Sequence, residues 1–409
     1  MSAVLRWLEP LSTSIPDVDI TGWQCLRRFA DDLQLLAGSA PDADDTGAWA
    51  MWLLSLRQEL ATRGHRAPAG SGAQAWQALA QFVAGFLDLD LRDCIGPGHG
   101  AMVLAGAVPE TAEYWRKRLL CGEVVGIAAT ERHGGSRLQE ITTRARLHRS
   151  GRWLLTGEKC WVARLNEASG FVVFFRDPDA HLTAAIIHAE EPGLERGVGE
   201  AAGLSGYSWG VLRLHDIPVE VGRDLIGGPG DGLRVFRQHF ASFRPLVAAT
   251  AVGTAAGIHT LVADALGARL KVGVLPRIRD NALITLGRTH AELTAALLSA
   301  LTAGRLAAAG HPSADVAAQT AKACGVDTAV RAVSELAPLI GAAGFQRGHP
   351  IAKARADLTG LLYADGIHDS LYRASGLRLL QGECDIKSVD RPMPVSSRAR
   401  FGFERGAGS

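Results

Sequence analysis

The alternation of hydrophobic and polar residues changes twice along this 409-residue chain. Over residues 21–121 the apolar side chains recur at helical spacing, which predicts amphipathic helices. Over residues 122–231 they alternate with polar residues at period two, most clearly from Ile141 to His148, which predicts strands. Over residues 232–380 the helical period returns in long segments rich in alanine and leucine. The pattern therefore predicts helices, then strands, then helices, which is a mixed α+β fold.

Turn-rich breaks and changes of period suggest where the regions divide. Glycine and proline gather at 64–72 and 95–100, between predicted helices. Further strands are predicted at 171–175, 184–187 and 211–217. We predict four regions: an N-terminal α-helical domain at 1–121, a middle β domain at 122–231, a C-terminal helical bundle at 232–380 and a polar tail at 381–409.

Composition narrows the class of protein. The 43 basic and 42 acidic residues leave a formal charge of +1, which argues against a nucleic-acid-binding surface. Six scattered cysteines without a Cys-x-x-Cys pair indicate reduced thiols, and the histidines lack metal-ligand spacing, so no metal site is expected. No secretory segment and no uncharged apolar stretch of eighteen residues is evident. We therefore expect a soluble, cytoplasmic protein that does not associate with membranes.

Two motifs in the strand-rich region carry candidate cofactor chemistry. The first contains Ala129, Thr130, Glu131, Gly134, Gly135 and Ser136. A strand that ends in such a turn offers backbone N–H groups and a hydroxyl to a ring edge or a phosphate. The second, 157–163, contains Trp161, whose flat face suits stacking against a ring. Taken alone, the first is equally typical of a Gly-rich hairpin turn and the second of a buried strand aromatic.

Three further blocks follow in the helical C-terminal region. Their main residues are Phe243, Arg244, Arg269, Gly273, Gly341, Gly344, Asp365 and Gly366. An arginine suits a charge-assisted contact to phosphate, and a desolvated carboxylate suits removal of a weakly acidic proton. Plainer interpretations remain open for two of them. Arg244 is also typical of a helix-start cation, and Asp365 of a solvated residue in an Asp-Gly turn.

In this order and spacing, the blocks resemble the acyl-CoA dehydrogenase family of FAD enzymes over about residues 85–380. The resemblance implies an N-terminal helical domain, a middle β-barrel-like or sandwich domain and a C-terminal four-helix bundle. It implies FAD as the cofactor and an acyl thioester, on coenzyme A or an acyl carrier protein, as the substrate. It also implies a homodimer or homotetramer, because the family shares its FAD site between subunits.

The resemblance also assigns roles to residues of this chain. Asp365 stands where the family keeps its catalytic base, usually the longer Glu. Substrate contacts are implied for Phe243 and Arg244. Cofactor contacts are implied for Ala129, Thr130, Gly135, Ser136, Trp161, Ala163, Arg269, Gly341 and Ile367.

Departures from the family pattern leave three functions open. Ala163 and Ile367 stand where the family has hydroxyl residues that contact the flavin cofactor, and Pro338 replaces a glutamine. The first hypothesis is FAD-dependent α,β-dehydrogenation of an acyl thioester, in specialised biosynthesis as the changes around Ser136 and Phe243 suggest. The second is a flavin-dependent oxidase or monooxygenase on the same fold, which the changes at Ala163 and Asp365 favour. The third is a degenerate, non-catalytic scaffold.

Overall fold

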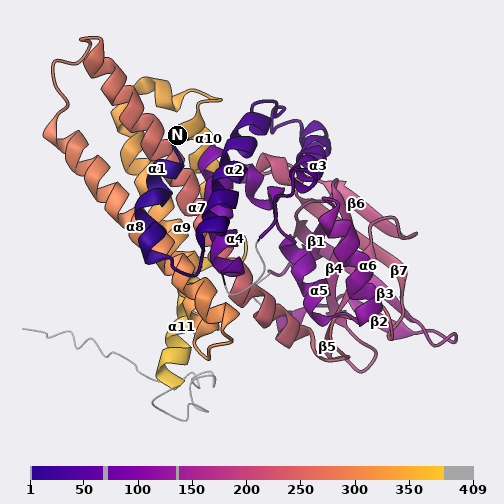
Figure 1. The fold of residues 1–409 in the computed structure, drawn as a ribbon. Helices are drawn as coiled ribbons and strands as arrows, with labels where there is room; N and C mark the ends of the chain where they lie inside the picture. Colours follow the sequence, from indigo (N-terminus) through magenta and orange to yellow (C-terminus); the bar gives the residue numbers. More distant parts are fainter. Residues whose placement is uncertain (1, 68–71, 135–137, 382–409) are drawn as a thin grey trace, which may run out of the picture.

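The computed structural model describes residues 2–67, 72–134 and 138–381. Its elements follow the predicted order of helices, strands and helices (Figure 1). The N-terminal part contains α1 (Leu5–Leu8), η1 (Glu9–Ser14), α2 (Ile20–Ala37), α3 (Thr46–Thr62), α4 (Ala73–Leu87), η2 (Leu89–Cys94), η3 (Gly98–Gly100), α5 (Ala101–Gly106) and α6 (Pro109–Leu120). Side-chain caps begin two of these helices, because Asp19 accepts a hydrogen bond from Gly22 N and Asp45 from Ala48 N.

The middle of the chain forms one seven-stranded sheet in the order β1-β4-β2-β3-β7-β6, with β5 paired to β4. Its elements are β1 (Val124–Ala128), η4 (Leu138–Glu140), β2 (Arg144–Leu147), β3 (Trp153–Val162), β4 (Ala168–Arg176), β5 (Leu182–His188), β6 (Leu194–Val198), η5 (Ser205–Tyr207) and β7 (Gly210–Val219). The predicted alternation holds at Ile141, Thr143 and Ala145, which are buried, whereas Leu147 is exposed at the end of β2.

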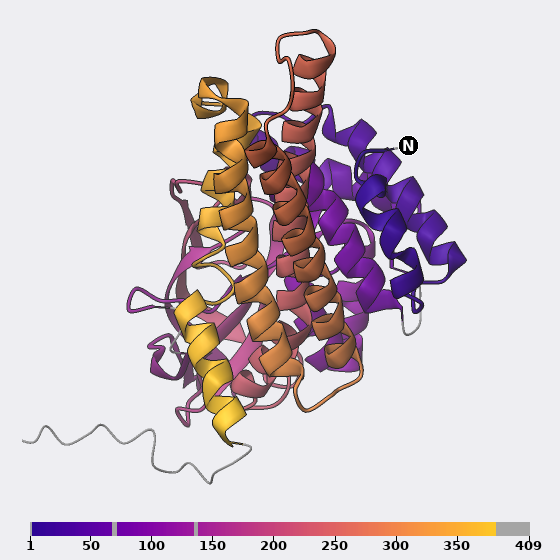
Figure 2. The same cartoon turned by 90° about the vertical axis from the view of Figure 1, so that its left-hand side faces the viewer.

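The C-terminal part is a bundle of long helices, which Figure 2 shows from the side. It contains α7 (Gly232–Lys271), α8 (Asp280–Ala308), α9 (Ala314–Ile340), η6 (Ala342–Phe345), α10 (Pro350–Gly360) and α11 (His368–Gln381). By length and composition α7 could cross a membrane, yet 67% of its most apolar window is buried among the other helices. It is the central helix of the bundle, in contact with α4, α8 and α9.

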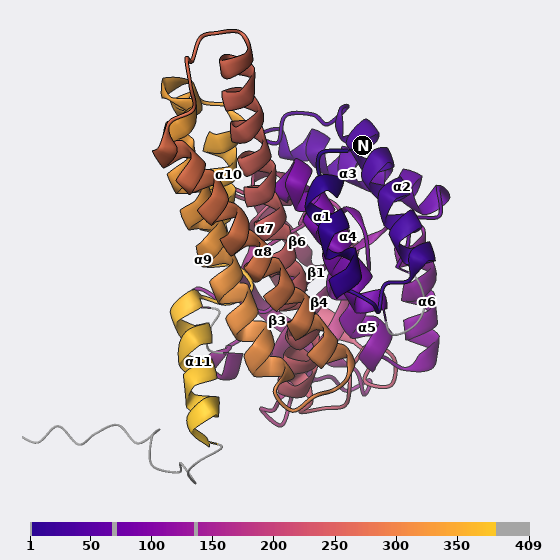
Figure 3. The same ribbon diagram turned by 60° about the vertical axis from the view of Figure 1, so that its left-hand side comes forward.

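The N-terminal helices and the bundle share a single hydrophobic core. Helix α4 lies directly against α7 (Figure 3). Glycines permit this close approach: a Cβ on Gly253 would lie 2.2 Å from Phe82 O, and one on Gly85 would lie 2.1 Å from Thr250 O. A second apolar cluster lies within the β domain, and a third packs between α5, α6 and the sheet. The resulting scaffold brings η2, the end of β3 and the α10–α11 connection close together.

Candidate functional site

Asp365 lies in the connection between α10 and α11, and its side chain is nearly enclosed, at 9% exposed. Its backbone adopts a left-handed φ of 58°, which L residues rarely adopt, and Gly366 follows with φ 115°. Arg244 Nε donates to Asp365 O at 3.1 Å. The solvated-loop interpretation of Asp365 is therefore wrong. Arg244 lies inside α7 rather than at its start, so the helix-start interpretation is wrong too.

The carboxylate of Asp365 is paired with a buried arginine that the sequence analysis did not select. Arg92 Nη1, on η2, lies 2.8 Å from Asp365 Oδ2, and Arg92 is 4% exposed. Its guanidinium also lies over the rings of Tyr207, at 5.0 Å, and Phe243, at 5.5 Å. Burial by itself lowers the pKa of Arg92, but Tyr207, Asp365 and the neighbouring Asp93 together hold it above its usual value. Arg92 is thus a permanent cation beside the candidate base.

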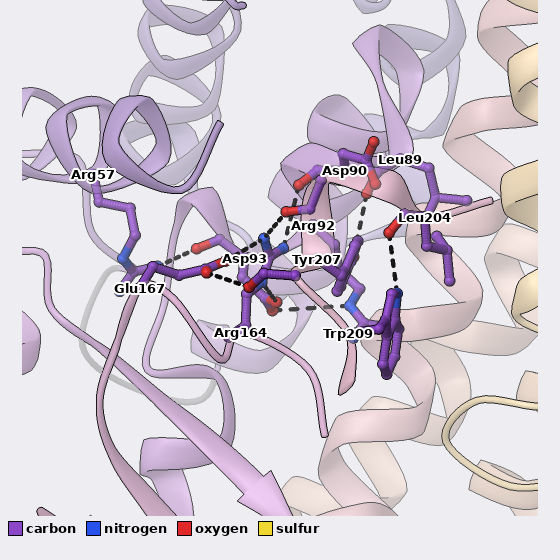
Figure 4. Close-up of polar contacts among 12 residues, drawn as sticks. Arg57, Leu89, Asp90, Arg92, Asp93, Arg164, Glu167, Leu204, Tyr207 and Trp209 are labelled. Atoms are coloured by element: carbon purple, nitrogen blue, oxygen red, sulfur yellow. Dashed lines mark hydrogen bonds and ion pairs between the residues drawn. The ribbon is translucent and has the colours of Figure 1, made fainter. Parts of the chain in front are cut away.

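A chain of buried polar contacts connects Arg92 to the end of β3 (Figure 4). Arg164 Nε lies 3.0 Å from Asp93 Oδ2, and its Nη1 lies 3.0 Å from Glu167 Oε1. The Arg164 guanidinium lies 3.9 Å from the Tyr207 ring centroid, so Tyr207 contacts both arginines. Although burial raises it, the charges of Arg164 and Arg92 lower the pKa of Asp93 well below its usual range. The β sheet and η2 are therefore locked together next to Asp365.

Arg92 and Phe243 also line a cavity of about 510 Å³ between the N-terminal helices and α7. This volume suits a small organic ligand. His239 lines it too, and His239 Nε2 lies 3.0 Å from His99 Nδ1. Burial lowers the pKa of His99 to about 4 and that of His239 well below its usual value. Both imidazoles are therefore neutral at pH 7, and Arg92 is the cation at this part of the wall.

The predicted flavin-side residues gather at the ends of β1 and β3. Ala129 and Thr130 directly follow β1, and Cys160 N donates to Thr130 O at 2.9 Å, which ties the two motifs together. Trp161 is 66% exposed with φ 54°, so the buried-aromatic interpretation is wrong. Ala163 is buried nearby. Gly135 and Ser136 lie outside the described residues, and Ile367 is half-exposed beside Gly366.

Glu131, within the first motif, is a structural anchor. Its carboxylate accepts hydrogen bonds from the backbone and hydroxyl groups of Thr142 and Thr143, at 2.6–2.9 Å. Lys159 Nζ, from the second motif, lies 2.8 Å from Glu131 Oε1. Burial raises the pKa of Glu131, but Lys159 and the threonines outweigh it and lower that pKa to about 2. Burial outweighs the same contact at Lys159, whose pKa falls to about 8. The pair is charged at neutral pH and holds the two motifs in register.

Arg269 and Gly341 lie together, but far from Asp365. Arg269 Nη2 donates to Ile340 O at 2.9 Å, directly before Gly341, whose φ is 82°. Arg244 contacts the Asp365 loop from the same helix, and at 1.5 Å per residue the two arginines are roughly 37 Å apart along α7. Side chains so far apart within one chain do not contact the same flavin ring.

The carboxylates of Asp88, Asp90 and Asp357 come close enough together to hold a metal ion. Lys353 Nζ occupies their centre, at 2.6, 2.8 and 2.7 Å from them respectively. Asp357 Oδ1 also accepts from Leu204 N at 2.6 Å. This cluster therefore joins η2, which carries Arg92, to α10, which leads to Asp365.

One of the residues that the sequence analysis missed had a visible signal in the sequence. Lys322 interrupts the small apolar residues of α9 and proves to be fully buried, which its place in an alanine-rich stripe indicates. Arg92 and Arg164 had none, because their partners lie up to 273 residues away along the chain. Long-range pairing of this kind is invisible to local pattern.

Comparison with protein families gives two adjoining matches that together cover more than half of the chain. Residues 126–217 match the acyl-CoA dehydrogenase middle domain, and residues 230–374 match the acyl-CoA dehydrogenase C-terminal domain. The chain belongs to the acyl-CoA dehydrogenase family. FAD is the cofactor of this family. The family assignment and the predicted fold class are both confirmed.

Individual relatives are distant. A probable acyl-CoA dehydrogenase, FadE25 of Mycobacterium tuberculosis, is 25% identical over 241 residues, which is 58% of this chain and 61% of the relative. A glutaryl-CoA dehydrogenase of Mycobacterium smegmatis, in complex with FADH2, superimposes with a TM-score of 0.75 at 18% identity, over 93% of this chain and 99% of that one. The prolyl acyl carrier protein oxidase AnaB gives 0.70 at 19% identity, over 88% and 99%. At these identities the structural matches show the fold.

The geometry of the described residues fits FAD on the cofactor side. Trp161 presents a large aromatic ring to the outside from a strained backbone, which is costly without a function. Trp161 directly follows Cys160, whose backbone N–H donates to Thr130 O and so joins the β1 and β3 motifs. An exposed flat apolar face at that point fits an isoalloxazine ring. Arg269 carries the positive charge that a pyrophosphate requires.

Proposed function

We propose that this protein is an FAD-dependent oxidoreductase that introduces an α,β double bond into an acyl thioester. The observation that carries the proposal is Asp365, an almost enclosed carboxylate beside Arg92, where Arg92 also lines the 510 Å³ cavity. A carboxylate removed from water and near a ligand cavity suits abstraction of a weakly acidic proton. The acyl chain lies in the cavity against Phe243 and His239.

In this proposal each residue has one task. Asp365 takes the proton from the α-carbon, and bound FAD supplies the acceptor for the hydride that leaves the β-carbon. Trp161 covers the cofactor ring and excludes water from it. Arg92 keeps a positive charge 2.8 Å from Asp365 Oδ2 and holds the carboxylate in place.

We propose a homo-oligomer as the working form, because the cofactor residues are divided between two distant places. Arg269 and Gly341 lie at the opposite end of α7 from the Asp365 loop. In the homo-oligomer, these two residues of one copy contact the cofactor that is bound beside Asp365 of the other copy. Several apolar side chains are exposed at the same end of α7, where the α7–α8 connection lies near the top of Figure 2. These are Val272, Val274, Leu283, Ile284 and Phe345. A cluster of exposed apolar side chains is typical of a surface that is covered by a partner.

The decisive experiment begins with the visible spectrum and the FAD content of the purified protein. The FAD-loaded protein is then mixed anaerobically with acyl thioesters of coenzyme A and of an acyl carrier protein, and loss of flavin absorbance is followed. Asp365→Asn should retain FAD and slow flavin bleaching by roughly 10²–10⁴-fold, because the base is lost. Bleaching at the wild-type rate in this variant would refute the assignment of Asp365. A colourless protein that takes up no added FAD would instead favour a non-catalytic scaffold.

A second candidate function is a flavin-dependent oxidase on the same fold. It is favoured by Ala163, which is buried beside the β3 motif and brings no hydroxyl to the cofactor side. The AnaB neighbour is titled an oxidase of a carrier-bound substrate, which is compatible with this choice. The two functions differ in how the reduced flavin reacts. Rapid reoxidation by air with formation of hydrogen peroxide supports the oxidase, and slow reoxidation supports the dehydrogenase. A biosynthetic role and a cytoplasmic location stay predictions.

A further inference from the structure

Lys322 is a fully buried lysine of α9 whose ammonium points at the connection that carries Asp365. Its Nζ donates to Leu361 O at 2.7 Å and to Gly366 O at 2.7 Å. These carbonyls lie at the two ends of the α10–α11 connection. Burial of a lysine is costly unless its hydrogen bonds are made. Lys322 joins the two ends of this loop, so we expect it to restrain the loop's conformation.

The connection needs such a restraint. Asp365 is held at φ 58°, an unfavourable conformation for a residue other than glycine. Strained backbone of this kind persists only when its surroundings determine it. Lys322 holds the carbonyls of residues 361 and 366, and Arg244 holds that of Asp365. Two basic side chains, one from α9 and one from α7, thus fix three carbonyls of one short loop.

The hold does not depend on the charge state of Lys322. Burial lowers the pKa of Lys322 to about 7, with Asp365 and Asp327 opposing this and Arg244 and Arg92 reinforcing it. The neutral amine retains two N–H donors, which is the number that the two carbonyls require. Burial lowers the pKa of His368, and the charge of Lys322 also acts on His368 and lowers it further. The two hydrogen bonds can therefore persist on either side of neutral pH.

We propose that Lys322 is the positioning residue that aims the Asp365 carboxylate at the substrate. The inference rests on the proposed function, because it gives Lys322 a purpose only if Asp365 is the base. A general base works within about 2.6–3.2 Å of the proton that it removes. Asp has one side-chain torsion fewer than Glu, so it compensates less for a displaced backbone. The short base and the restrained loop therefore belong together.

The test compares Lys322→Met with Ser375→Ala in the FAD-loaded protein. Ser375 Oγ donates to Gln319 Oε1 at 3.1 Å, a buried contact between α11 and α9 that does not touch the loop. Lys322→Met should slow flavin reduction by roughly 10²-fold, because a displacement near 1 Å costs that much, with KM changed less than about threefold. Ser375→Ala should reduce flavin like the wild type. Equal rates in the two variants would overturn the proposal.

Amide hydrogen exchange separates this inference from the proposed function. Exchange at residues 361–367 should increase in Lys322→Met, whereas Lys159→Met, which also removes a buried lysine but in the sheet, should leave these amides unchanged. Lys322→Gln keeps donors and serves if the Met variant does not fold; it should show an intermediate increase. Unchanged exchange in both Lys322 variants would overturn the inference. If no acyl thioester reduces the flavin of the wild-type protein, the proposed function is refuted instead, while the exchange data still test the restraint.

Discussion

Replacing Lys353 by methionine should lower the free energy of unfolding, because it breaks the contact between η2 and α10. The loss should be larger at high pH than at low pH. Three carboxylates surround the Lys353 ammonium at 2.6–2.8 Å, and Asp90 and Asp357 are buried. Burial, followed by the charge of Asp90, raises the pKa of Asp357 to about 7. Near neutral pH Asp357 is therefore partly protonated beside the Lys353 ammonium.

The magnitude follows from these charges. Each carboxylate attracts the ammonium by about 4 kcal/mol at an effective dielectric constant near 20. Mutual repulsion of the carboxylates and the cost of burying the Lys353 ammonium offset most of this attraction. The remaining cost of deleting the central charge is about 3–5 kcal/mol, which is the usual range when one partner of a buried ion pair is lost.

The sign of the pH dependence follows from the pKa values. Burial by itself lowers the pKa of Lys353, but the three carboxylates raise it above its usual 10.5, so its contribution is complete at both pH 5 and pH 8. Folded Asp357 keeps a proton that the unfolded chain releases above pH 3.8, so stability falls as pH rises from about 4 to about 7. Without the ammonium this loss becomes larger and extends to higher pH. The variant's deficit should therefore be larger at pH 8 than at pH 5.

The assay is urea unfolding followed by tryptophan fluorescence at pH 5 and pH 8. Lys117→Met, at an exposed site on α6, is the control and should change the free energy of unfolding by less than about 0.5 kcal/mol. A deficit for Lys353→Met below about 1 kcal/mol at pH 8, or one that is as large at pH 5, would refute the reasoning. Either outcome would mean that solvent already screens the cluster.

Three other predictions concern the cofactor side and the subunit contact. Glu131→Gln should be less stable than the wild type at pH 7, and its stability should fall less as the pH is lowered. The pKa of Glu131 is about 2 in the folded protein against its usual 4.5, so its contribution is present above pH 4.5 and lost toward pH 2. An acid unfolding curve that matches the wild type would contradict this. Trp161→Ala should weaken FAD binding by roughly three- to tenfold in a fluorescence titration of the apoprotein, and an unaltered affinity would exclude stacking. Val272→Glu combined with Phe345→Glu should lower the mass by light scattering, and an unchanged mass argues against this interface.

The periodicity of the chain predicted the order of its elements because that signal is local. Each strand and helix must bury one face, so its apolar residues repeat every two or 3.6 positions whatever its neighbours are. The strands predicted at 171–175, 184–187 and 211–217 lie within β4, β5 and β7, and the helical period predicted from residue 232 begins with α7. The motif at Asp365 also had a sequence signal, since Asp followed by Gly is typical of a left-handed turn.

The polar surroundings of the candidate site were set by tertiary structure alone. Arg92 meets Asp365 across 273 residues of chain, and Lys322 meets Gly366 across 44. No repeat or spacing announces such contacts, because the helices and the sheet must first pack before the partners are neighbours. The exposure of Trp161 and the wide separation of Arg269 from Asp365 were decided in the same way. The sequence by itself thus determined the elements, the family and the candidate base, whereas packing decided which charges surround that base, because burial and long-range pairing exist only in the folded chain.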